Sequence, residues 1–216
     1  MRAVTRIDRG HVLLCNGGME RRWSSFDGAL VSWCVGHPRR ELLPAPTHAW
    51  TIALNGRRLT PFDFGELETS EACDEDFAQI EMRFVRPEVH GIYRAWLHHT
   101  RHVGFSSFEM KNCGTAPVTL TTWEAECLPR VGLTPEIIPA GGITVIRICL
   151  PFATVVLGAH REKMCPVVDS TRAALVWQGE EMLGTGMMFP KVFWGVVFPP
   201  STDIAPLLEF AESYLT

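Results

Sequence analysis

The sequence has no long apolar run and no cluster of basic residues, and each absence argues against a class of function. The first residues carry positive charge but lack the apolar core of a secretory signal peptide. No uninterrupted apolar stretch approaches the roughly 20 residues of a membrane helix. The basic residues are scattered through a chain of net charge −4, unlike those of nucleic-acid-binding proteins. We therefore expect a soluble, cytoplasmic protein whose partners include neither membrane nor nucleic acid.

Paired cysteines are also missing. The seven cysteines are odd in number, widely spread and never arranged as C-x-x-C, so neither a zinc site nor a disulfide framework is indicated. We expect most of them to be reduced and several to be buried as small apolar residues, with no metal and no cofactor bound.

The composition is that of a globular chain, with 46% hydrophobic and 20% charged residues. A β-sandwich of 216 residues often forms one domain, so we expect residues 1–216 to be a single β-sandwich domain.

Residues 78–128 predict four consecutive antiparallel strands. Ile80, Met82 and Phe84 alternate with polar residues, which is typical of a strand with one buried face. Two β-rich runs follow at 89–98 and 103–111, and a fourth strand begins at Val118. Its β-branched and aromatic residues fill both faces, which predicts a second layer nearby.

The flanking segments predict further strands. Hairpins are expected at 20–35 around Asp27-Gly28 and at 50–59 around Asn55-Gly56. Near-continuous apolar strands are expected at 143–150 and 153–159, with the last strands at 173–178 and 187–198. We expect loops at 60–76, which is acidic, and at 129–142, and a short helix at 204–215.

Several of these motifs resemble the N-terminal β-sandwich of α-galactosidase-type glycoside hydrolases, which is related to the galactose-mutarotase fold. In that family a strand ends in an N-x-G turn and resumes with "pV-x-L". The residues here that fit are the Tyr93-Arg94-Ala95-Trp96 run, Asn112-Cys113-Gly114, Pro117-Val118-Thr119-Leu120 and Glu124.

The two ends of the chain fit the same pattern. His11 to Gly18, with Glu20 to Trp23 and Asp27 to Leu30, is similar to the family's opening hairpin. Val192 to Pro199 looks like its closing strand, although the acidic residue often found before the last proline is absent. The resemblance implies an all-β, two-layer antiparallel β-supersandwich with little helix.

The resemblance also implies an association with carbohydrate. In the family the catalytic carboxylates lie on a barrel that follows the sandwich, so no catalytic role is transferred to this chain. We expect a non-catalytic domain that binds sugar or docks to a glycosidase catalytic domain. A structural oligomerisation module, forming a homo-oligomer, is an open alternative.

A second alternative is a small sugar epimerase or mutarotase, which needs one group to remove a proton and another to supply one. The candidate catalytic residues are His98, His102 and Glu124, with Glu126 as a further acid. A three-histidine metal site is disfavoured, because His98 and His99 point to opposite faces of a strand.

Tryptophan is a favoured platform for the apolar face of a sugar, and the chain has seven. Trp23 and Trp50 lie near hairpin ends and are the expected exposed, ligand-binding tryptophans. Trp96, Trp123 and Trp194 lie inside predicted strands and are expected to fill the interior.

Overall fold

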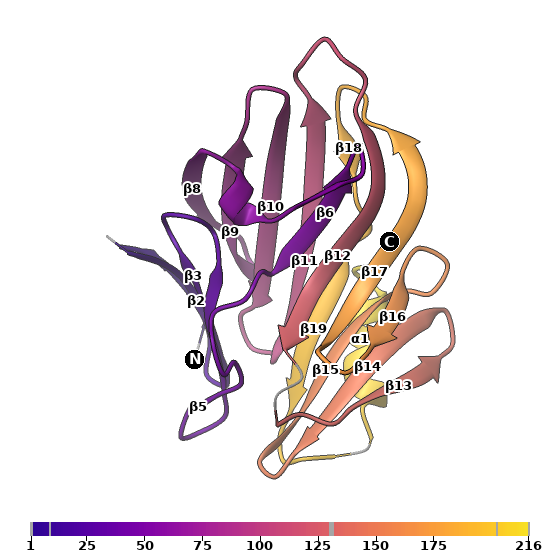
Figure 1. The fold of residues 1–216 in the computed structure, drawn as a ribbon. Helices are drawn as coiled ribbons and strands as arrows, with labels where there is room; N and C mark the ends of the chain where they lie inside the picture. The colour runs from indigo at the N-terminus through magenta and orange to yellow at the C-terminus, as the bar shows by residue number, and fades with distance from the viewer. Residues whose placement is uncertain (1, 9, 130–131, 202, 216) are drawn as a thin grey trace.

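The computed structural model describes residues 2–8, 10–129, 132–201 and 203–215, and within them the chain forms mainly antiparallel strands (Figure 1). One layer of this described part is a nine-stranded sheet in the order β13-β14-β15-β19-β11-β10-β9-β8, with β18 also paired to β11. Its strands are β8 (Glu66–Cys73), β9 (Phe77–Val85), β10 (Val89–His98), β11 (Val103–Asn112), β13 (Pro135–Ala140), β14 (Ile143–Leu150), β15 (Ala153–His160), β18 (Met187–Met188) and β19 (Val192–Val197).

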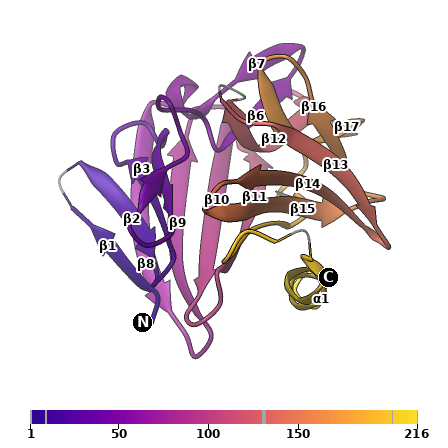
Figure 2. The same cartoon turned by 90° about the horizontal axis from the view of Figure 1, so that it is seen from below.

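Two smaller sheets form the second layer, each with five strands in the described residues. Strands β1 and β2 of the first contact β8 and β9, whereas β12 and β17 of the second contact β19 and β15 (Figure 2). The first sheet contains β1 (Val4–Ile7), β2 (His11–Cys15), β3 (Met19–Ser24), β4 (Leu30–Val35) and β5 (Arg40–Glu41). The second contains β16 (Cys165–Val168), β17 (Arg172–Met182), β12 (Thr119–Pro129), β6 (Trp50–Leu54) and β7 (Arg57–Leu59). The predicted all-β, two-layer architecture is confirmed.

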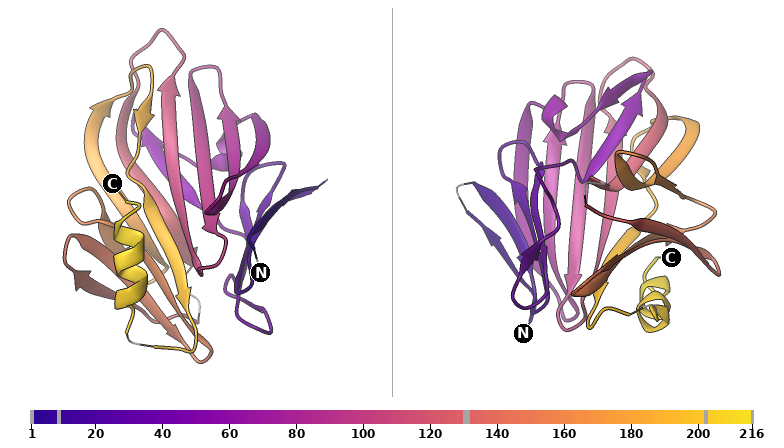
Figure 3. Two further views of the ribbon diagram at one scale, coloured as in Figure 1. Left: turned by 180° about the vertical axis from the view of Figure 1, so that it is seen from behind. Right: turned by 60° about the horizontal axis from the view of Figure 1, so that its bottom comes forward.

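The C-terminal helix α1 (Ala205–Glu212) lies on the outer surface of the large sheet (Figure 3). Leu207, Leu208 and Phe210 pack against a small apolar cluster on that surface, so the predicted terminal helix and its anchors are confirmed. The other helical segment of the described chain is the 3₁₀ helix η1 (Pro61–Asp63). Neither is long and apolar enough to cross a membrane.

The main core lies between the two layers, where the period-two pattern predicted it. Ile80, Met82 and Phe84 of β9 are at most 1% exposed and belong to this core. Glu81 and Arg83 lie on the opposite face, where they form an ion pair. The large sheet therefore has one face inside the sandwich and one face outside it.

The two predicted hairpins are also confirmed. Strands β6 and β7 pair with Leu54 opposite Arg57, and the intervening Asn55 and Gly56 have φ values of 49° and 76°. Both residues lie in the left-handed region that a two-residue hairpin turn requires. Strands β3 and β4 likewise pair across a turn that contains Gly28.

Three expectations for individual segments are wrong. The fourth predicted strand, β12, does not continue the sheet of β9, β10 and β11 but crosses to the other layer, where it pairs with β6 and β17. The segment expected to be an acidic loop contains the strand β8. It is an edge strand that pairs with β9 alone, so its glutamates can remain exposed to solvent. The expected connection at 129–142 contains β13, whose two prolines are tolerated because it is also an edge strand.

A buried ion pair joins the three sheets. Arg21 on β3 and Glu126 on β12 are both fully buried, with Nη2 and Oε2 2.7 Å apart. Glu126 Oε1 accepts hydrogen bonds from Ser106 Oγ on β11 at 2.6 Å and from the Tyr93 hydroxyl on β10 at 3.4 Å. Burial is the main reason that the pKa of Tyr93 is raised, so its hydroxyl remains a donor.

Aromatic rings enclose the same guanidinium group. The Cζ atom of Arg21 lies 4.5 Å from the ring centroids of both Trp33 and Trp194 and 5.3 Å from that of Trp23. Cation–π attraction to these ring faces partly compensates the cost of removing the charge from water.

We predict that Glu126→Leu lowers the free energy of unfolding by about 3–5 kcal/mol, because it leaves the Arg21 charge buried without its counter-ion. The double variant Arg21→Met/Glu126→Leu should recover most of that loss, since an apolar pair replaces the ion pair. Urea denaturation of the two variants beside the parent measures both values. A double variant as unstable as the single one would contradict this account.

All seven cysteines lie in described residues and none forms a disulfide. The expectation that several are buried is confirmed only for Cys15, with Cys34 and Cys127 partly covered. Burial raises the pKa of the Cys34 thiol and raises that of Cys127 to about 11. The exposed cysteines are Cys73, Cys113, Cys149 and Cys165.

We expect iodoacetamide at pH 8 to alkylate the four exposed cysteines of the folded protein first, because the reaction requires an accessible thiolate. Cys15, Cys34 and Cys127 should react only after denaturation. Peptide mass mapping over time gives the order, and early labelling of Cys127 would show that its surroundings are less closed than in the structure.

Candidate functional site

The two tryptophans expected to bind ligand are buried. Trp23 is 0% exposed and Trp50 is 1% exposed, so the prediction that they lie at the surface is wrong. Trp50 stacks on Phe108 of the large sheet with ring centroids 4.5 Å apart, and Trp23 packs against Tyr93 at 6.3 Å. Both belong to strands whose inner face points between the layers, so proximity to a hairpin turn did not bring them to the surface.

Glu124 lies on the face of β12 opposite the buried Trp123 and Ala125. Its Oε2 atom is 2.8 Å from Nη2 of Arg58, and its Oε1 atom is 2.8 Å from Nη2 of Arg172. Thr51 Oγ1 also donates to Oε2 at 2.9 Å. Both oxygens are therefore engaged by cations, which suits a structural ion pair better than a proton acceptor.

The two candidate histidines lie at another place in the fold. His98 is on the outer face of β10, where its ring contacts those of Phe77 and Phe210 and its Nδ1 atom accepts the backbone N–H groups of Thr100 and Arg101. His102 follows in the turn between β10 and β11, with its ring against Phe198.

Burial is the main cause that lowers the pKa of both His98 and His102, so both are mainly uncharged at pH 7. No hydrogen bond, ion pair or ring contact joins either histidine to Glu124 or Glu126 within the described ranges. Glu124 and Glu126 belong to β12 in the opposite layer. The structure therefore does not bring the proposed acid–base group together. The part of the chain that the structure describes also contains no cluster of three metal-ligating side chains.

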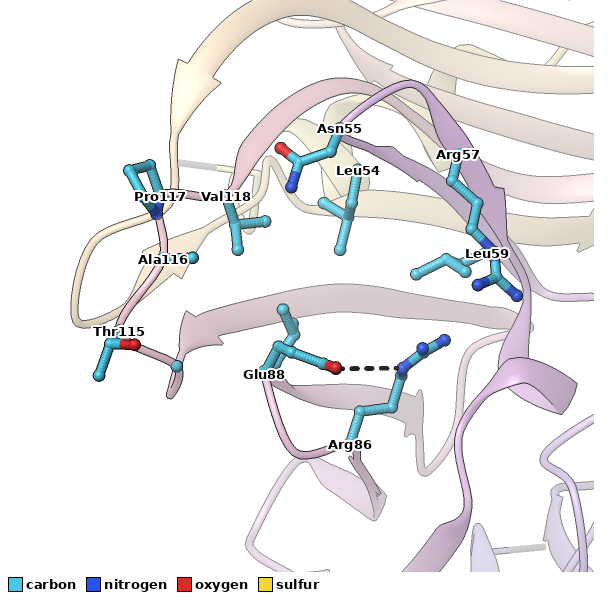
Figure 4. A pocket seen from close by; sticks show the side chains of 12 residues that line it. Leu54, Asn55, Arg57, Leu59, Arg86, Glu88, Thr115, Ala116, Pro117 and Val118 are labelled. Atoms are coloured by element: carbon cyan, nitrogen blue, oxygen red, sulfur yellow. Dashed lines mark ion pairs between the residues drawn. The ribbon is translucent and has the colours of Figure 1, made fainter.

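A large open hollow lies instead at the end of the sandwich, where three connections meet (Figure 4). We call it the end pocket; its volume is about 540 Å³. The β6–β7 turn, the β9–β10 turn and the β11–β12 loop form its walls. Its lining is Leu54, Asn55, Arg57, Leu59, Arg86, Glu88, Val89, Gly114, Thr115, Ala116, Pro117 and Val118.

The floor of the end pocket is apolar and its rim is polar. Leu54 and Leu59, at the ends of β6 and β7, and Val118, just before β12, form this floor and are each 5–6% exposed. Asn55 Oδ1 accepts the backbone N–H of Thr119 at 2.8 Å, which turns the amide nitrogen toward the hollow (Figure 4). The turn chemistry that closes the hairpin thus also orients a hydrogen-bond donor.

Two arginines converge on the same space (Figure 4). Arg86 Nη1 donates to the backbone oxygen of Asp63 at 3.0 Å, and its Nε atom lies 3.7 Å from Glu88 Oε2. The Arg57 side chain is 68% exposed and lies 3.6 Å from the Asp63 carboxylate. A hydrogen bond from the Thr60 backbone is the main cause that lowers the pKa of Asp63, which is therefore ionised at pH 7. Arg86 is held in place, whereas Arg57 is accessible to a ligand.

The end pocket offers an apolar floor and charged, hydrogen-bonding groups to a ligand. Among the described residues, Glu88 is the one carboxylate that lines it, Glu88 faces Arg86, and no histidine lines it. Hydrolysis of a glycosidic bond needs two carboxyl groups on opposite sides of that bond. Sequence reasoning identified the Asn55-Gly56 and Asn112-Cys113-Gly114 turns but had no signal that they lie side by side.

No protein-family model matches the chain, and no curated protein matches it. The structure is similar to the GH36 α-galactosidase AgaB from Geobacillus stearothermophilus, with a TM-score of 0.63 and 10% identity over 93% of this chain and 41% of that one. It is also similar to YidC from Thermotoga maritima, with a TM-score of 0.52 and 12% identity over 100% of this chain and 58% of that one. The periplasmic domain of T. maritima YidC matches with a TM-score of 0.50 and 12% identity over 100% of this chain and 99% of that domain.

The chain spans less than two thirds of the length of AgaB and of the longer YidC chain. At these identities the likeness concerns the fold alone. It confirms the fold expected from the sequence, the galactose-mutarotase-like β-supersandwich found in α-galactosidase-type glycoside hydrolases.

Proposed function

We propose that this chain is a non-catalytic, carbohydrate-associated β-sandwich domain and that the end pocket binds a saccharide. The observation that supports this most is the composition of the pocket. Sugars combine apolar C–H faces with a rim of hydroxyl groups that donate and accept hydrogen bonds. The apolar floor of the pocket and its polar rim of Asn55, Arg57, Arg86 and Glu88 complement both.

The size and rigidity of the pocket agree with this role. A volume of about 540 Å³ lies within the usual range for small-ligand sites. Arg86 and Asn55 are already held by bonds to the protein, so little side-chain freedom is lost when a ligand binds. Fold likeness to an α-galactosidase supports the carbohydrate class, although it specifies neither a sugar nor a site.

The epimerase alternative has less support. It requires a histidine and a carboxylic acid to reach one sugar ring, and His98 and His102 lie in a different layer from Glu124. The two Glu124 oxygens also remain paired with Arg58 and Arg172. In the other form of this proposal the end pocket is part of an interface with a catalytic domain, and the experiment below separates such docking from sugar binding.

We predict that one or more monosaccharides or galacto-oligosaccharides bind to the purified chain and shift the amide resonances of residues around the end pocket. Arg57→Gln should weaken binding about tenfold or more, because a hydrogen bond to a charged group contributes about 1.5–3 kcal/mol. Titrations followed by two-dimensional NMR measure the affinity and locate the site at once.

Arg83→Gln is the matched control. Arg83 is similarly exposed and paired with one carboxylate, but it lies on the outer face of β9, so its loss should leave sugar affinity unchanged. Anomerisation is assayed in the same samples, and turnover would contradict the non-catalytic assignment. If no saccharide shifts the pocket amides, sugar binding is wrong and docking becomes the better account.

A further inference from the structure

A second, smaller hollow lies on the outer face of the large sheet, beside α1. We call it the aromatic recess; it has a volume of about 210 Å³. Its lining is Asp74, Phe77, Trp96, Phe105, Lys191 and Tyr214. Val89 and Trp96 are seven residues apart on β10, so the end pocket and the recess are separated by about 24 Å along the strand. The two hollows are therefore distinct.

The recess is built largely from aromatic rings. Phe77 and Phe105 are 7% and 2% exposed and form its floor, with ring centroids 5.9 Å apart at an interplanar angle of 75°. Tyr214, which follows α1, packs against both rings at 5.2 and 5.4 Å. Trp96 provides a further wall and is only half-buried, which corrects the expectation that it fills the interior.

Hydrogen bonds hold the walls in position. Trp96 Nε1 donates to Gln79 Oε1 at 2.6 Å, which fixes the orientation of the indole. Asp74 Oδ1 accepts the backbone N–H groups of Asp76 and Phe77 at 2.8 and 2.7 Å, which holds the carboxylate at the rim. A ligand would thus meet aromatic rings and one carboxylate already in place.

The charges around the recess are mainly negative. Asp74, Glu75 and Asp76 are consecutive and exposed, and Asp74 itself lines the recess. The nearby cations are Arg2, whose guanidinium donates to the Asp74 backbone oxygen at 3.0 Å, and Lys191, which donates to the Tyr214 backbone oxygen at 3.2 Å. His98 contacts Phe77 from the side, and burial lowers its pKa, so it adds little charge at pH 7.

A sugar ring fits this recess poorly. Its hydroxyl groups would face Phe77 and Phe105, and among the described lining residues the side chains with a formal charge are those of Asp74 and Lys191. Hydroxyl groups buried without partners are costly. A compact cation with an apolar surface has no such groups, and aromatic faces attract it.

We propose that the aromatic recess is a binding site for a small quaternary or methylated ammonium group. The cation lies between Trp96 and Tyr214, above Phe77 and Phe105, and Asp74 supplies the counter-charge. This inference does not depend on sugar binding at the end pocket, because the two sites share no residue.

Choline and its neutral isostere, in which carbon replaces the quaternary nitrogen, test the role of charge in the unmodified protein. The two molecules have nearly the same shape, so a cation site should bind choline at least tenfold more tightly, whereas a merely apolar hollow binds both equally. Because Trp96 forms a wall of the recess, binding of either molecule should change the tryptophan fluorescence of the chain, and calorimetry measures the same affinities independently. Equal affinity, or no binding of choline up to tens of millimolar, would overturn the proposal.

Two charge variants give effects of opposite sign. Asp74→Asn should weaken choline binding several-fold, because the counter-charge is lost. Lys191→Gln should strengthen it several-fold, because a repelling ammonium group is removed from the lining. A purely structural role for these residues would weaken binding in both variants, and that result would also contradict the proposal.

Trp96→Leu removes one aromatic wall and should reduce the preference for choline over its isostere several-fold, because the other rings and Asp74 remain. The matched control is Trp177→Leu, since Trp177 is also half-buried but lies on β17 in the second small sheet. Choline binding by the variants is followed by calorimetry, which needs no reporter tryptophan. A Trp177→Leu effect equal to that of Trp96→Leu would place the ligand elsewhere.

Discussion

The fold depends on the burial of one charge, that of Arg21. Its guanidinium comes from the first small sheet, its counter-ion Glu126 comes from the second, and Ser106 on the large sheet donates to the same carboxylate. A buried ion pair is tolerated only when geometry and additional hydrogen bonds compensate for lost hydration. Because these partners come from all three sheets, the ion pair and the hydrogen bond from Ser106 form together only when the sheets take their observed arrangement. We infer that this requirement specifies how the two layers are assembled.

A local irregularity of β12 makes the arrangement possible. Regular alternation would place Glu124 and Glu126 on the same face of the strand. The register of β12 against β17 shifts between Ala125 and Leu128, and Glu126 has a φ of 54°, which is unfavourable for a residue with a side chain. The irregularity turns Glu126 inward to Arg21 while Glu124 stays with its arginines on the opposite face. Backbone strain at this position is therefore offset by the ion pair that it permits.

Local patterns predicted the parts of this fold that depend on near neighbours in the sequence. The alternation along β9 and the Asn55-Gly56 turn are visible in a few residues, and both are confirmed. The crossing of β12 to the other layer depends on pairing with β6, more than 60 residues away. The strand β8 was missed because its acidic side chains resemble those of a loop, although an edge strand exposes such side chains without cost. The burial of Trp23 and Trp50 likewise depends on side chains of the opposite layer, which are distant in the sequence.

Neither hollow was predicted, because each depends on segments that are distant in the sequence. Each is formed by segments that are ordinary when considered alone: turns around the end pocket, and a strand face with a terminal helix around the recess. The chemistry of each hollow arises because these segments lie side by side in the folded protein. Strand β10 begins at the end pocket with Val89 and reaches the recess at Trp96, so a single strand contributes to both. Two hollows of different composition thus lie along one large sheet, and in each of them hydrogen bonds already hold lining side chains in position.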